Sequence, residues 1–283
     1  MASILVLFGL LASAAGLPTL KLRSPNKILG GEMADYGDYP YQISIQIWGG
    51  ILGWQHVCGG SILNENWILT ASHCNILNVI GQSDARVVAG FLTLLENDDE
   101  PTQQAAEVAE FIKHPDFIYE SLTGYIRHDI ALIRLATPLN LNAGPEVAAA
   151  VLPSSEDSFP VFDVEASCIA SGWGTDGYGI FELPSNDLLW TNITAFTDEK
   201  CLEIWGDYTY APVQMLCAGT YEGGHGVCSG DSGGPILCEA EDGSMVVFGV
   251  TSFGDISCGE NAAYPEVWTE INHYLDWIQE TAV

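Results

Sequence analysis

Alternation of apolar and polar side chains predicts that this chain folds mainly into short β-strands. The stretch at 41–48, YQISIQIW, alternates as a strand with one buried face does. Shorter apolar runs bounded by Gly, Asn or Asp are typical of further strands separated by turns. These runs lie at 61–63, 67–70, 85–89, 131–135 and 245–251. The pattern therefore predicts an all-β fold.

Helical periodicity is clearest near the C-terminus, where it predicts a helix over 271–281. The residues at helical spacing are Ile271, Tyr274, Leu275 and Ile278. The stretch 136–155 holds three prolines and few strand signals. We interpret it as a connector between two β-rich halves, about 28–137 and about 150–270.

The first 27 residues differ in character from the rest. An apolar stretch at 4–11 is followed by small residues up to Gly16, the order found in a secretory signal peptide. We expect residues 1–16 to be a signal peptide and the protein to be secreted. Beyond them, no apolar run reaches the roughly 18 to 20 residues that a membrane span needs.

The charge distribution is strongly asymmetric, with 8 Lys plus Arg against 37 Asp plus Glu. Three of the bases, Lys21, Arg23 and Lys27, lie before residue 28, where no acid occurs. Residues 28–283 therefore carry 5 bases and 37 acids, a formal charge of −32. A surface this anionic repels phosphate backbones and anionic lipids, so we expect neither nucleic acid nor membrane as a partner.

Eight cysteines in a chain that we expect to be exported indicate disulfides. No two cysteines have the short spacing of zinc ligands, so we expect no metal and no cofactor. Eight cysteines allow more than a hundred pairings, and their spacing does not choose among them.

The stretch GDSGGP at 230–235 is the most informative motif of the chain. A nucleophilic serine needs an exposed hydroxyl, and flanking glycines let the backbone turn so that its N–H groups face a substrate. An ordinary Gly-rich turn is the alternative interpretation. This hexapeptide would arise by chance only about once in ten million positions, so we interpret Ser232 as a nucleophile.

A serine hydroxyl needs a base to take its proton. Among six histidines, His73 follows an apolar strand and precedes Cys74. Asp129 begins another apolar strand, where a carboxylate can be buried against an imidazole. A single His or Asp is more often structural than catalytic. The order His, Asp, Ser nevertheless narrows the choice, because α/β-hydrolases and subtilisin-type enzymes have other orders.

Six segments together resemble the chymotrypsin-like serine proteases, and the resemblance runs from Ile28 to the C-terminal helix. The segments are ILGG at 28–31, LTASHC at 69–74, RHDIAL at 127–132, GWG at 172–174, GDSGGP at 230–235 and SFG at 252–254. The resemblance implies two packed six-stranded antiparallel Greek-key barrels with a C-terminal α-helix, and an active site in the cleft between the barrels.

The resemblance also implies a role for each site residue. Ser232 would attack the scissile carbonyl, His73 would act as general base and then acid, and Asp129 would orient His73. Backbone N–H groups of Gly230 and Ser232 would form the oxyanion hole. Four disulfides would leave no free cysteine: Cys58–Cys74, Cys168–Cys238, Cys201–Cys217 and Cys228–Cys258.

The resemblance also implies that the chain is made as an inactive precursor. A trypsin-like protease would cut this precursor after Lys27 and release a propeptide of residues 17–27. The new amine of Ile28 would then pair with Asp231 and shape the oxyanion hole. We therefore expect a zymogen that acts as a monomer on protein and peptide substrates. An activating trypsin-like protease and protein protease inhibitors are the other expected partners.

The specificity pocket departs from the pattern of trypsins, which carry an Asp six residues before the nucleophile. Gly226 stands there, and Gly254 leaves the pocket open to large side chains. Glu266 replaces the Gly of the usual Pro-Gly-Val-Tyr and puts a carboxylate in the pocket wall. The resemblance implies a pocket formed by Gly226, Ser252, Phe253, Gly254 and Glu266. Crab collagenolytic proteases combine a Gly floor with such an acid and accept both bulky apolar and basic residues.

Three minor features concern ions and glycans. Phe91 follows Gly90 where calcium-binding relatives carry a Glu, and the acidic run at 96–100 is interpreted as a solvated loop. Asn192 begins the sequon Asn-Ile-Thr and is a candidate glycosylation site.

Two alternatives remain beside a digestive endopeptidase. A non-catalytic binding protein with this fold would lack a member of the catalytic set, whereas all three residues and the oxyanion glycine are present. A regulatory cascade protease of narrow specificity is the second alternative. No further domain precedes the propeptide in this sequence, which favours a digestive enzyme.

Overall fold

The structure is a computed structural model. It describes residues 28–75, 84–95, 100–154, 165–175, 183–240 and 243–283. The expected signal peptide and propeptide lie outside the described residues, as does the acidic run up to residue 99. Within the described ranges, no helix is long and apolar enough to cross a membrane.

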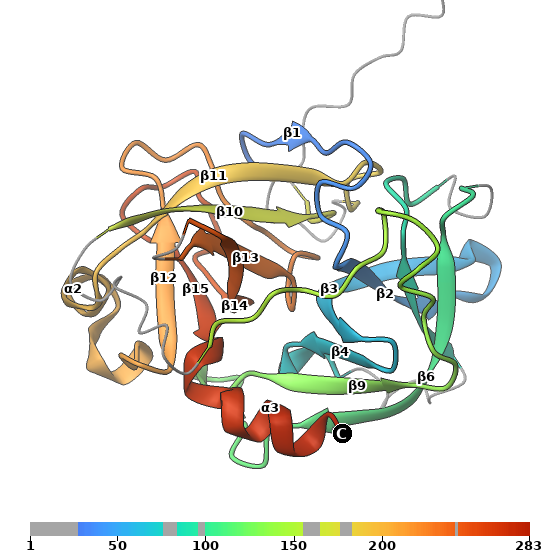
Figure 1. Cartoon of the computed structure of the whole chain (residues 1–283). Coiled ribbons are helices and arrows are strands. Elements are labelled where there is room, and N and C mark those ends of the chain that lie inside the picture. Colours follow the sequence, from blue (N-terminus) through green and yellow to red (C-terminus); the bar gives the residue numbers. More distant parts are fainter. Residues whose placement is uncertain (1–27, 76–83, 96–99, 155–164, 176–182, 241–242) are drawn as a thin grey trace, which may run out of the picture.

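The first half of the described chain forms a closed antiparallel barrel of six strands (Figure 1). In circular order these are β2 (Gln42–Trp48), β3 (Trp54–Asn64), β4 (Trp67–Thr70), β9 (Ala131–Leu135), β6 (Gln104–Lys113) and β5 (Ala85–Ala89). Two 3₁₀ turns belong to this half, η1 (Gly50–Leu52) between β2 and β3, and η2 (Ser72–Cys74) after β4. A hairpin of β7 (Ile118–Glu120) and β8 (Tyr125–Arg127) connects β6 to β9.

The second half forms another barrel with the same strand connectivity. Its strands are β10 (Ala166–Gly172), β11 (Leu189–Ala195), β12 (Met215–Gly219), β15 (Glu266–Glu270), β14 (Met245–Phe253) and β13 (Pro235–Glu239). Pairing of β11 with β12 closes this barrel, and β1 (Glu32–Met33) adds a short strand to β11. In both barrels the third strand along the chain pairs with the sixth, and the first pairs with the fourth. The two six-stranded Greek-key barrels expected from the sequence are therefore confirmed.

Helices occupy only two positions among the described residues. The C-terminal helix was expected at 271–281. It begins as a 3₁₀ turn, η5 (Ile271–Tyr274), continues as α3 (Leu275–Thr281), and its buried side chains join the core of the first barrel. Sequence analysis missed α2 (Asp198–Thr209), which is capped by Thr197 and carries two acids in its first turn.

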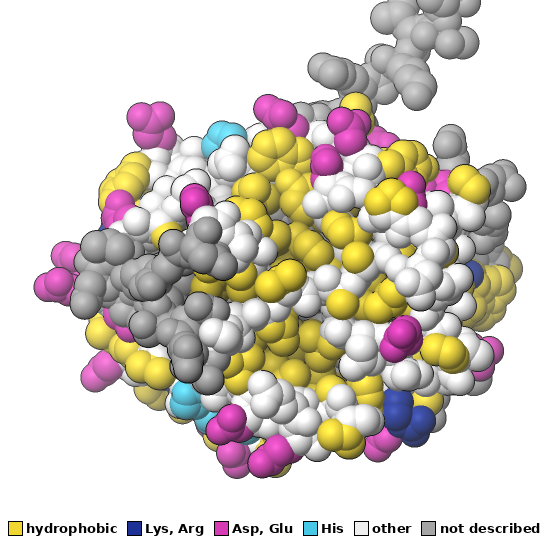
Figure 2. Space-filling view, in the orientation of Figure 1, with side chains coloured by type: hydrophobic (Ala, Val, Ile, Leu, Met, Phe, Trp, Pro, Cys, Tyr) yellow, Lys and Arg dark blue, Asp and Glu magenta, His cyan; other side chains and the backbone are white. Residues whose placement is uncertain are grey.

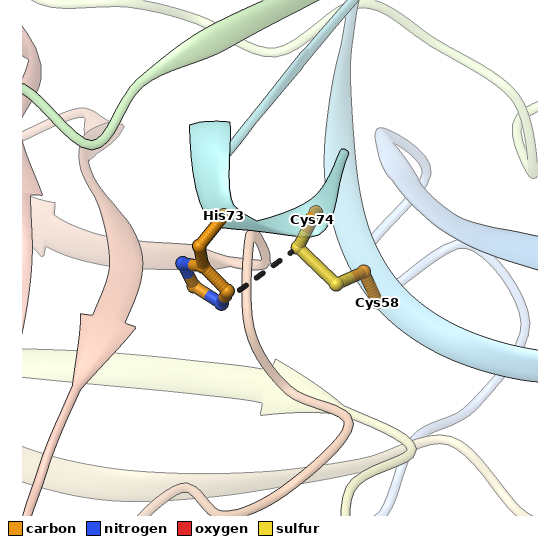
Figure 3. Close-up of side chains that lie close together, drawn as sticks. All are labelled: Cys58, His73 and Cys74. Carbon is orange, nitrogen blue, oxygen red and sulfur yellow. Dashed lines mark hydrogen bonds between the residues drawn. A yellow bond between two sulfur atoms is a disulfide. The ribbon is translucent and has the colours of Figure 1, made fainter. Parts of the chain in front are cut away.

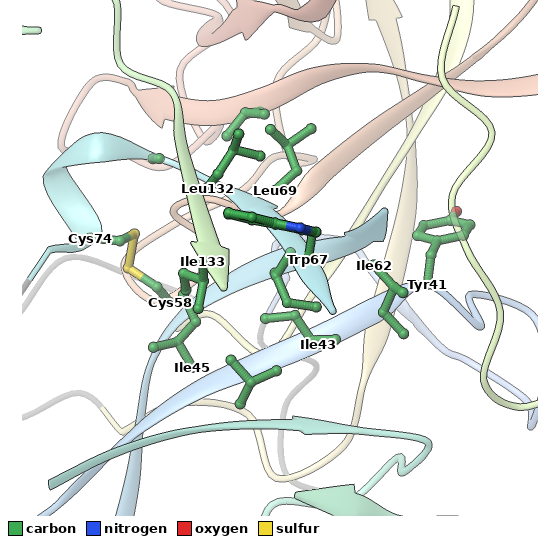
Figure 4. Packing of buried hydrophobic residues seen from close by; sticks show 14 of the residues in the cluster. Tyr41, Ile43, Ile45, Cys58, Ile62, Trp67, Leu69, Cys74, Leu132 and Ile133 are labelled. Atoms are coloured by element: carbon green, nitrogen blue, oxygen red, sulfur yellow. A yellow bond between two sulfur atoms is a disulfide. The ribbon is translucent and has the colours of Figure 1, made fainter. Parts of the chain in front are cut away.

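Strand β2 shows how the two barrels meet. Ile43 and Ile45 point into the apolar core of the first barrel, as the alternating pattern predicts (Figure 4). The polar side chains of this strand, Gln42, Ser44 and Gln46, are buried too, and Gln42 contacts the second barrel. Gln42 Oε1 accepts a hydrogen bond of 2.8 Å from Ser171 Oγ of β10. Strand β2 is thus buried on both faces, with apolar contacts on one and hydrogen bonds on the other.

Four disulfides cross-link the described chain, and two of them, Cys58–Cys74 and Cys228–Cys258, hold segments that carry expected site residues. Their pairs are those that the resemblance implies: Cys58–Cys74, Cys168–Cys238, Cys201–Cys217 and Cys228–Cys258. The described residues include no free cysteine.

Candidate active site

His73 and Asp129 meet at one edge of the first barrel. His73 lies in η2, and its Nδ1 donates to Asp129 Oδ2 over 2.6 Å, while its backbone N–H donates to Asp129 Oδ1 over 2.9 Å. Ser252 Oγ, from the second barrel, donates to Asp129 Oδ2 over 2.6 Å. Asp129 is fully buried. Burial alone would lower the pKa of His73, but the charge and hydrogen bond of Asp129 raise it above 6.5.

The disulfide Cys58–Cys74 holds the segment of His73 against β3 (Figure 3). The sulfur of Cys74 lies 3.9 Å from His73 Nε2. These three residues form the only group of potential metal ligands found in the described part of the chain. Both cysteines are oxidised, and a metal ligand must be a thiolate, so this group does not bind a metal.

Backbone contacts place Ser232 beside the His73 segment. Its carbonyl accepts a hydrogen bond of 2.8 Å from the N–H of Gly59, the residue after Cys58. Gly233, with a positive φ of 78°, lies so close to β4 that a Cβ there would collide with the side chain of Thr70. The glycine after the serine is therefore required for close approach of the two barrels.

Two N–H groups flank this serine without a protein acceptor. Gly230 adopts a positive φ of 101°. Neither the N–H of Gly230 nor that of Ser232 donates a hydrogen bond to another described residue. Unpaired N–H groups next to a serine hydroxyl can bind an oxyanion that develops on a substrate.

His56 contacts the turn that carries Ser232, through the carbonyl of Gly230, and sequence analysis missed this contact. Its Nε2 lies 2.9 Å from the carbonyl oxygen of Gly230, and its Nδ1 lies 2.7 Å from Ser44 Oγ. Because a carbonyl only accepts, Nε2 carries the proton, and Nδ1 accepts from Ser44. Burial lowers the pKa of His56 to about 4, so the ring stays neutral at physiological pH. The only sequence signal was its place on the strand that leads to Cys58.

Asp231 is buried beneath the turn and accepts hydrogen bonds from backbone N–H groups of Gly174 (2.7 Å) and Cys228 (2.9 Å). No cationic side chain among the described residues pairs with it. Burial therefore raises the pKa of Asp231 to about 7. A Cβ at Gly174 would collide with its carboxylate, which explains a glycine after Trp173.

Ile28 lies beside the second barrel, in the same half of the molecule as Asp231. Its side chain is fully buried, and the next residue, Leu29, forms an isolated β-bridge with Gly226. The chain thus enters the second barrel beside the segment 226–231, which carries the floor of the expected pocket and Asp231.

Two of the expected pocket residues, Gly226 and Gly254, lie against Glu266, the first residue of β15. A Cβ at Gly226 would lie 2.5 Å from Glu266 Oε1, and a Cβ at Gly254 would lie 3.0 Å from its Cγ. The carboxylate therefore occupies space that the two glycines leave open. Phe253, next to Ser252 at the end of β14, pairs with Val267. The disulfide Cys228–Cys258 joins the two segments that hold the glycines.

The carboxylate of Glu266 is buried without a counter-charge. Its side chain is 2% exposed, and neither oxygen has a hydrogen-bond partner among the described residues. Burial raises the pKa of Glu266 to about 8, and the nearby charges of Asp231 and Asp255 act in the same direction. Such a group is stabilised in its charged form only when a cation enters.

Contacts with other protein side chains fix the loop after Gly90. Phe91 stacks on Trp173 at 4.8 Å between ring centroids. The carboxylate of Glu100, the last residue of the acidic run, accepts hydrogen bonds of 3.1 Å from the N–H groups of Leu92 and Thr93. Glu100 is therefore a loop-closing residue, although sequence analysis treated it as solvated.

Asn192, the candidate glycosylation site, lies on β11 with its side chain exposed. Its neighbours on the strand, Thr191 and Ile193, are buried. The alternation of the strand thus turns the asparagine amide toward solvent.

Comparison with known proteins identifies the family of this chain. The family described as Trypsin matches residues 28–278. The chain is 31% identical over 262 residues to prostatic glandular kallikrein-6 of Rattus norvegicus, which covers 90% of this chain and 89% of the relative. The chain belongs to the trypsin family of chymotrypsin-like serine proteases and is a serine endopeptidase.

Proposed function

We propose that this chain is a secreted digestive endopeptidase, made as a zymogen, that cleaves after both bulky apolar and basic residues. Protein substrates follow from its family. Secretion is supported by the signal-like first 16 residues and by four disulfides, which persist in oxidising compartments. An activating trypsin-like protease and protein inhibitors would be its partners.

Hydrolysis would proceed through an acyl-enzyme. Ser232 Oγ attacks the scissile carbonyl while its proton moves to His73 Nε2, and the N–H groups of Gly230 and Ser232 stabilise the oxyanion. The same proton then passes to the leaving amine as the peptide bond breaks. Water then attacks the acyl-enzyme and gives a proton to His73, which passes it to Ser232 Oγ as the ester bond breaks and the acid is released. Asp129 keeps Nδ1 protonated throughout, because its oxygen accepts that proton's hydrogen bond.

Activation would complete the turn that carries Ser232. Cleavage after Lys27 gives Ile28 a free ammonium, and Ile28 enters the protein beside the segment that ends at Asp231. A buried carboxylate without a cation is unfavourable, so pairing with this ammonium would stabilise the charged form of Asp231. The pairing would fix the N–H groups of the oxyanion hole.

The buried, unpartnered carboxylate of Glu266 is the observation that carries the dual specificity. A Lys or Arg side chain in the pocket would supply the missing counter-charge. A Phe or Tyr side chain would be accepted while Glu266 is protonated, because a neutral carboxyl group costs less than a charged one beside an apolar ring. Since the pKa of the empty pocket's Glu266 is about 8, both states are accessible near neutral pH.

The test is kcat/KM for matched peptides that differ only in Lys or Phe before the scissile bond, measured from pH 5 to 9. We expect the ratio of Lys to Phe cleavage to rise with pH as Glu266 ionises. Glu266→Gln keeps the size of the side chain and removes its charge. It should reduce Lys cleavage by about 10-fold to 100-fold while changing Phe cleavage little, since a paired buried charge contributes about 1.5 to 3 kcal/mol.

An exposed acid provides the matched control. Glu110→Gln, on the surface of the first barrel, should leave the ratio unchanged. A Glu266→Gln variant with the wild-type ratio at every pH would show that this carboxylate does not read the substrate.

A further inference from the structure

Helix α2 contacts both halves of the candidate active site. It belongs to the second barrel, where its Cys201 is bridged to β12. Gly206 interrupts the helix with a φ of 74° and a ψ of 163°. Trp205 therefore ends the regular part of α2, and Tyr208 and Thr209 lie in a separate last turn. The two parts contact different segments of the site.

Trp205 lies against the expected specificity pocket. Its indole N–H donates a hydrogen bond of 3.1 Å to the carbonyl of Pro265, the residue before Glu266. Its ring meets that of Phe253 edge-on, with 5.5 Å between centroids. Phe253 is one of the expected pocket residues. The regular part of α2 thus contacts the end of β14 and the start of β15, which carry the pocket.

Arg127, from the first half of the chain, holds the last turn of the same helix. Its Nη2 donates to the carbonyl of Tyr208 over 2.7 Å, and its Nη1 donates to that of Thr209 over 2.8 Å. The last carbonyls of a helix lack partners within it and carry its negative partial charge, which a cation stabilises. Because α2 has no basic residue in its own last turn, a residue of the other half supplies the cation.

The surroundings of Arg127 indicate that this contact is specific. Residues 28–283 carry 37 acids and 5 bases, and Figure 2 shows acidic side chains over one face with basic ones at few points. Arg127 is nevertheless only 8% exposed and forms no ion pair with a described carboxylate. A buried cation is costly unless its donors are hydrogen-bonded, and here the carbonyls of α2 accept them.

An aromatic contact joins the same two segments. The guanidinium carbon of Arg127 lies 4.5 Å from the ring centroid of Tyr125, and the ring of Tyr125 lies 5.0 Å from that of Tyr208. Strand β8 and the last turn of α2 are therefore connected through two side chains of β8.

The pair of His73 and Asp129 is held independently of Arg127, although Arg127 lies only two residues before Asp129. The carboxylate of Asp129 accepts from His73 and Ser252. Its backbone carbonyl accepts a hydrogen bond of 2.9 Å from Thr269 Oγ1. Loss of Arg127 would therefore release α2 and leave this pair in place. The effect should fall on substrate binding and not on the chemical step.

We infer that Arg127 is a positioning residue for substrate binding: it clamps α2 between the two halves and, through Trp205, fixes Phe253 and the segment that leads into Glu266. The inference rests on the proposed pocket. Substrates with Lys and with Phe use the same pocket, so Arg127 should affect both alike. The charge of Glu266, in contrast, should affect cleavage after Lys alone.

The main experiment is Arg127→Met in the activated enzyme, which keeps an unbranched side chain and removes its charge and donors. Both kcat and KM are measured with the matched Lys and Phe peptides. We expect KM to rise about 10-fold for both peptides, the effect of losing one hydrogen bond to a charged group, with kcat unchanged. The ratio of Lys to Phe cleavage should keep its wild-type value. Arg134→Met, which removes an exposed base of β9, should change neither constant.

Hydrogen exchange followed by mass spectrometry tests the connection from Arg127 to the pocket. Amides of residues 253–266 should exchange faster in Arg127→Met than in wild type, and Arg134→Met should match wild type. Faster exchange confined to the last turn of α2 would contradict transmission to the pocket. A lower melting temperature with wild-type KM would show a structural role alone and would overturn the inference. A fall in kcat with KM unchanged would overturn it as well.

A double-variant cycle tests whether Arg127 and Trp205 act as one unit, with substitutions that keep more of the native packing. Arg127→Lys retains the buried charge but lacks the planar fork that reaches two carbonyls. Trp205→Phe retains an aromatic ring and loses the N–H that donates to Pro265. Each should raise KM, and the double variant should raise it by less than the product of the two effects, because both break one connection. Effects that simply multiply would refute the unit.

Glu266→Gln, assayed in parallel, separates this inference from the proposed function. If that variant keeps the wild-type ratio of Lys to Phe cleavage while the Arg127 variants raise KM, the dual specificity fails and the role of Arg127 stands. If Glu266→Gln lowers the ratio and the Arg127 variants keep the wild-type KM, only the inference about Arg127 fails.

Discussion

The two barrels contribute unlike halves to the active site. In the half built on the first barrel, every polar atom of Asp129 that faces His73 is already hydrogen-bonded. In the half built on the second barrel, the described residues offer no cation to Asp231 and no hydrogen-bond partner to Glu266. They also offer no acceptor to the N–H groups of Gly230 and Ser232. The first half has its hydrogen-bond partners within the described protein, whereas the second has groups that a new terminus or a substrate would pair under the proposed function.

The difference follows from what each half has to do. A base must be held in one tautomer before any substrate arrives, so its partners belong to the protein. Groups that bind a developing oxyanion or a substrate cation must be free beforehand, and their burial without partners costs stability. Among the described residues, the carboxylate of Glu266 and the N–H groups beside Ser232 fit this second requirement.

The largest expected effect comes from breaking the completed half. Asp129→Asn would keep the shape of the side chain, but it would remove the charge and replace one accepting oxygen with an NH2 group. His73 would then lose the hydrogen bond that orients it. We expect kcat of the activated enzyme to fall roughly 10⁴-fold, with KM changed far less. Far-ultraviolet circular dichroism and thermal unfolding should show that the variant is folded. A loss below tenfold would contradict the role given to this pair.

Two disulfides that close loops of the same length, one in each half of the molecule, allow the effect of a bridge on stability to be separated from its effect on kcat. Cys58–Cys74 and Cys201–Cys217 each span 16 residues, so the chain-entropy account gives each about 3 kcal/mol of stability. Replacing either pair by serines should lower the free energy of unfolding by a similar amount. Only loss of Cys58–Cys74 should also reduce kcat, because that bridge holds His73. Equal losses of kcat from both double variants, measured where each is fully folded, would argue against this division.

The smallest expected effect concerns Glu270, a second buried acid at the end of β15. Its side chain is 2% exposed, and one carboxylate oxygen has no partner in the described structure. Burial, with a contribution from the charge of Asp198, raises the pKa of Glu270 to about 9. The native state thus keeps a proton that the unfolded chain has already released, and the free energy of unfolding falls as pH rises from about 4 to about 9.

Glu270→Gln should remove this contribution. Between pH 7 and 9, the wild-type precursor should lose roughly 1 kcal/mol of stability per pH unit from this group, and the variant should show a flatter profile. Asp231 and Glu266 contribute in the same direction only up to about pH 7 and 8, where they ionise. Denaturant unfolding at several pH values measures the slope, with Glu110→Gln as the exposed control. An unchanged slope in Glu270→Gln would contradict the assignment.

Sequence motifs predicted the two barrels through the family that they resemble. The Gly-rich motif made Ser232 a candidate site residue, because glycines that permit close approach leave a readable pattern. Local patterns failed where tertiary contacts decide. The helix α2 contains Gly206 at a non-helical φ of 74°, which interrupts its periodicity. The burial of Glu270 and the support that His56 gives to Gly230 depend on strands distant in sequence. An acidic residue such as Glu270 is expected at the surface, so its residue type did not indicate that it would be buried.

Cleavage after Lys27 should complete the half-site of the second barrel, and labelling of Ser232 by a phosphonofluoridate would detect this change. This reagent reacts with a serine whose oxyanion site and base are both in place. Uncut and cut forms of the same preparation would be labelled side by side and the modified peptide identified by mass spectrometry. We predict rapid labelling of Ser232 in the cut form and slow labelling in the uncut form. Equal rates in the two forms, or labelling of another residue, would contradict the account.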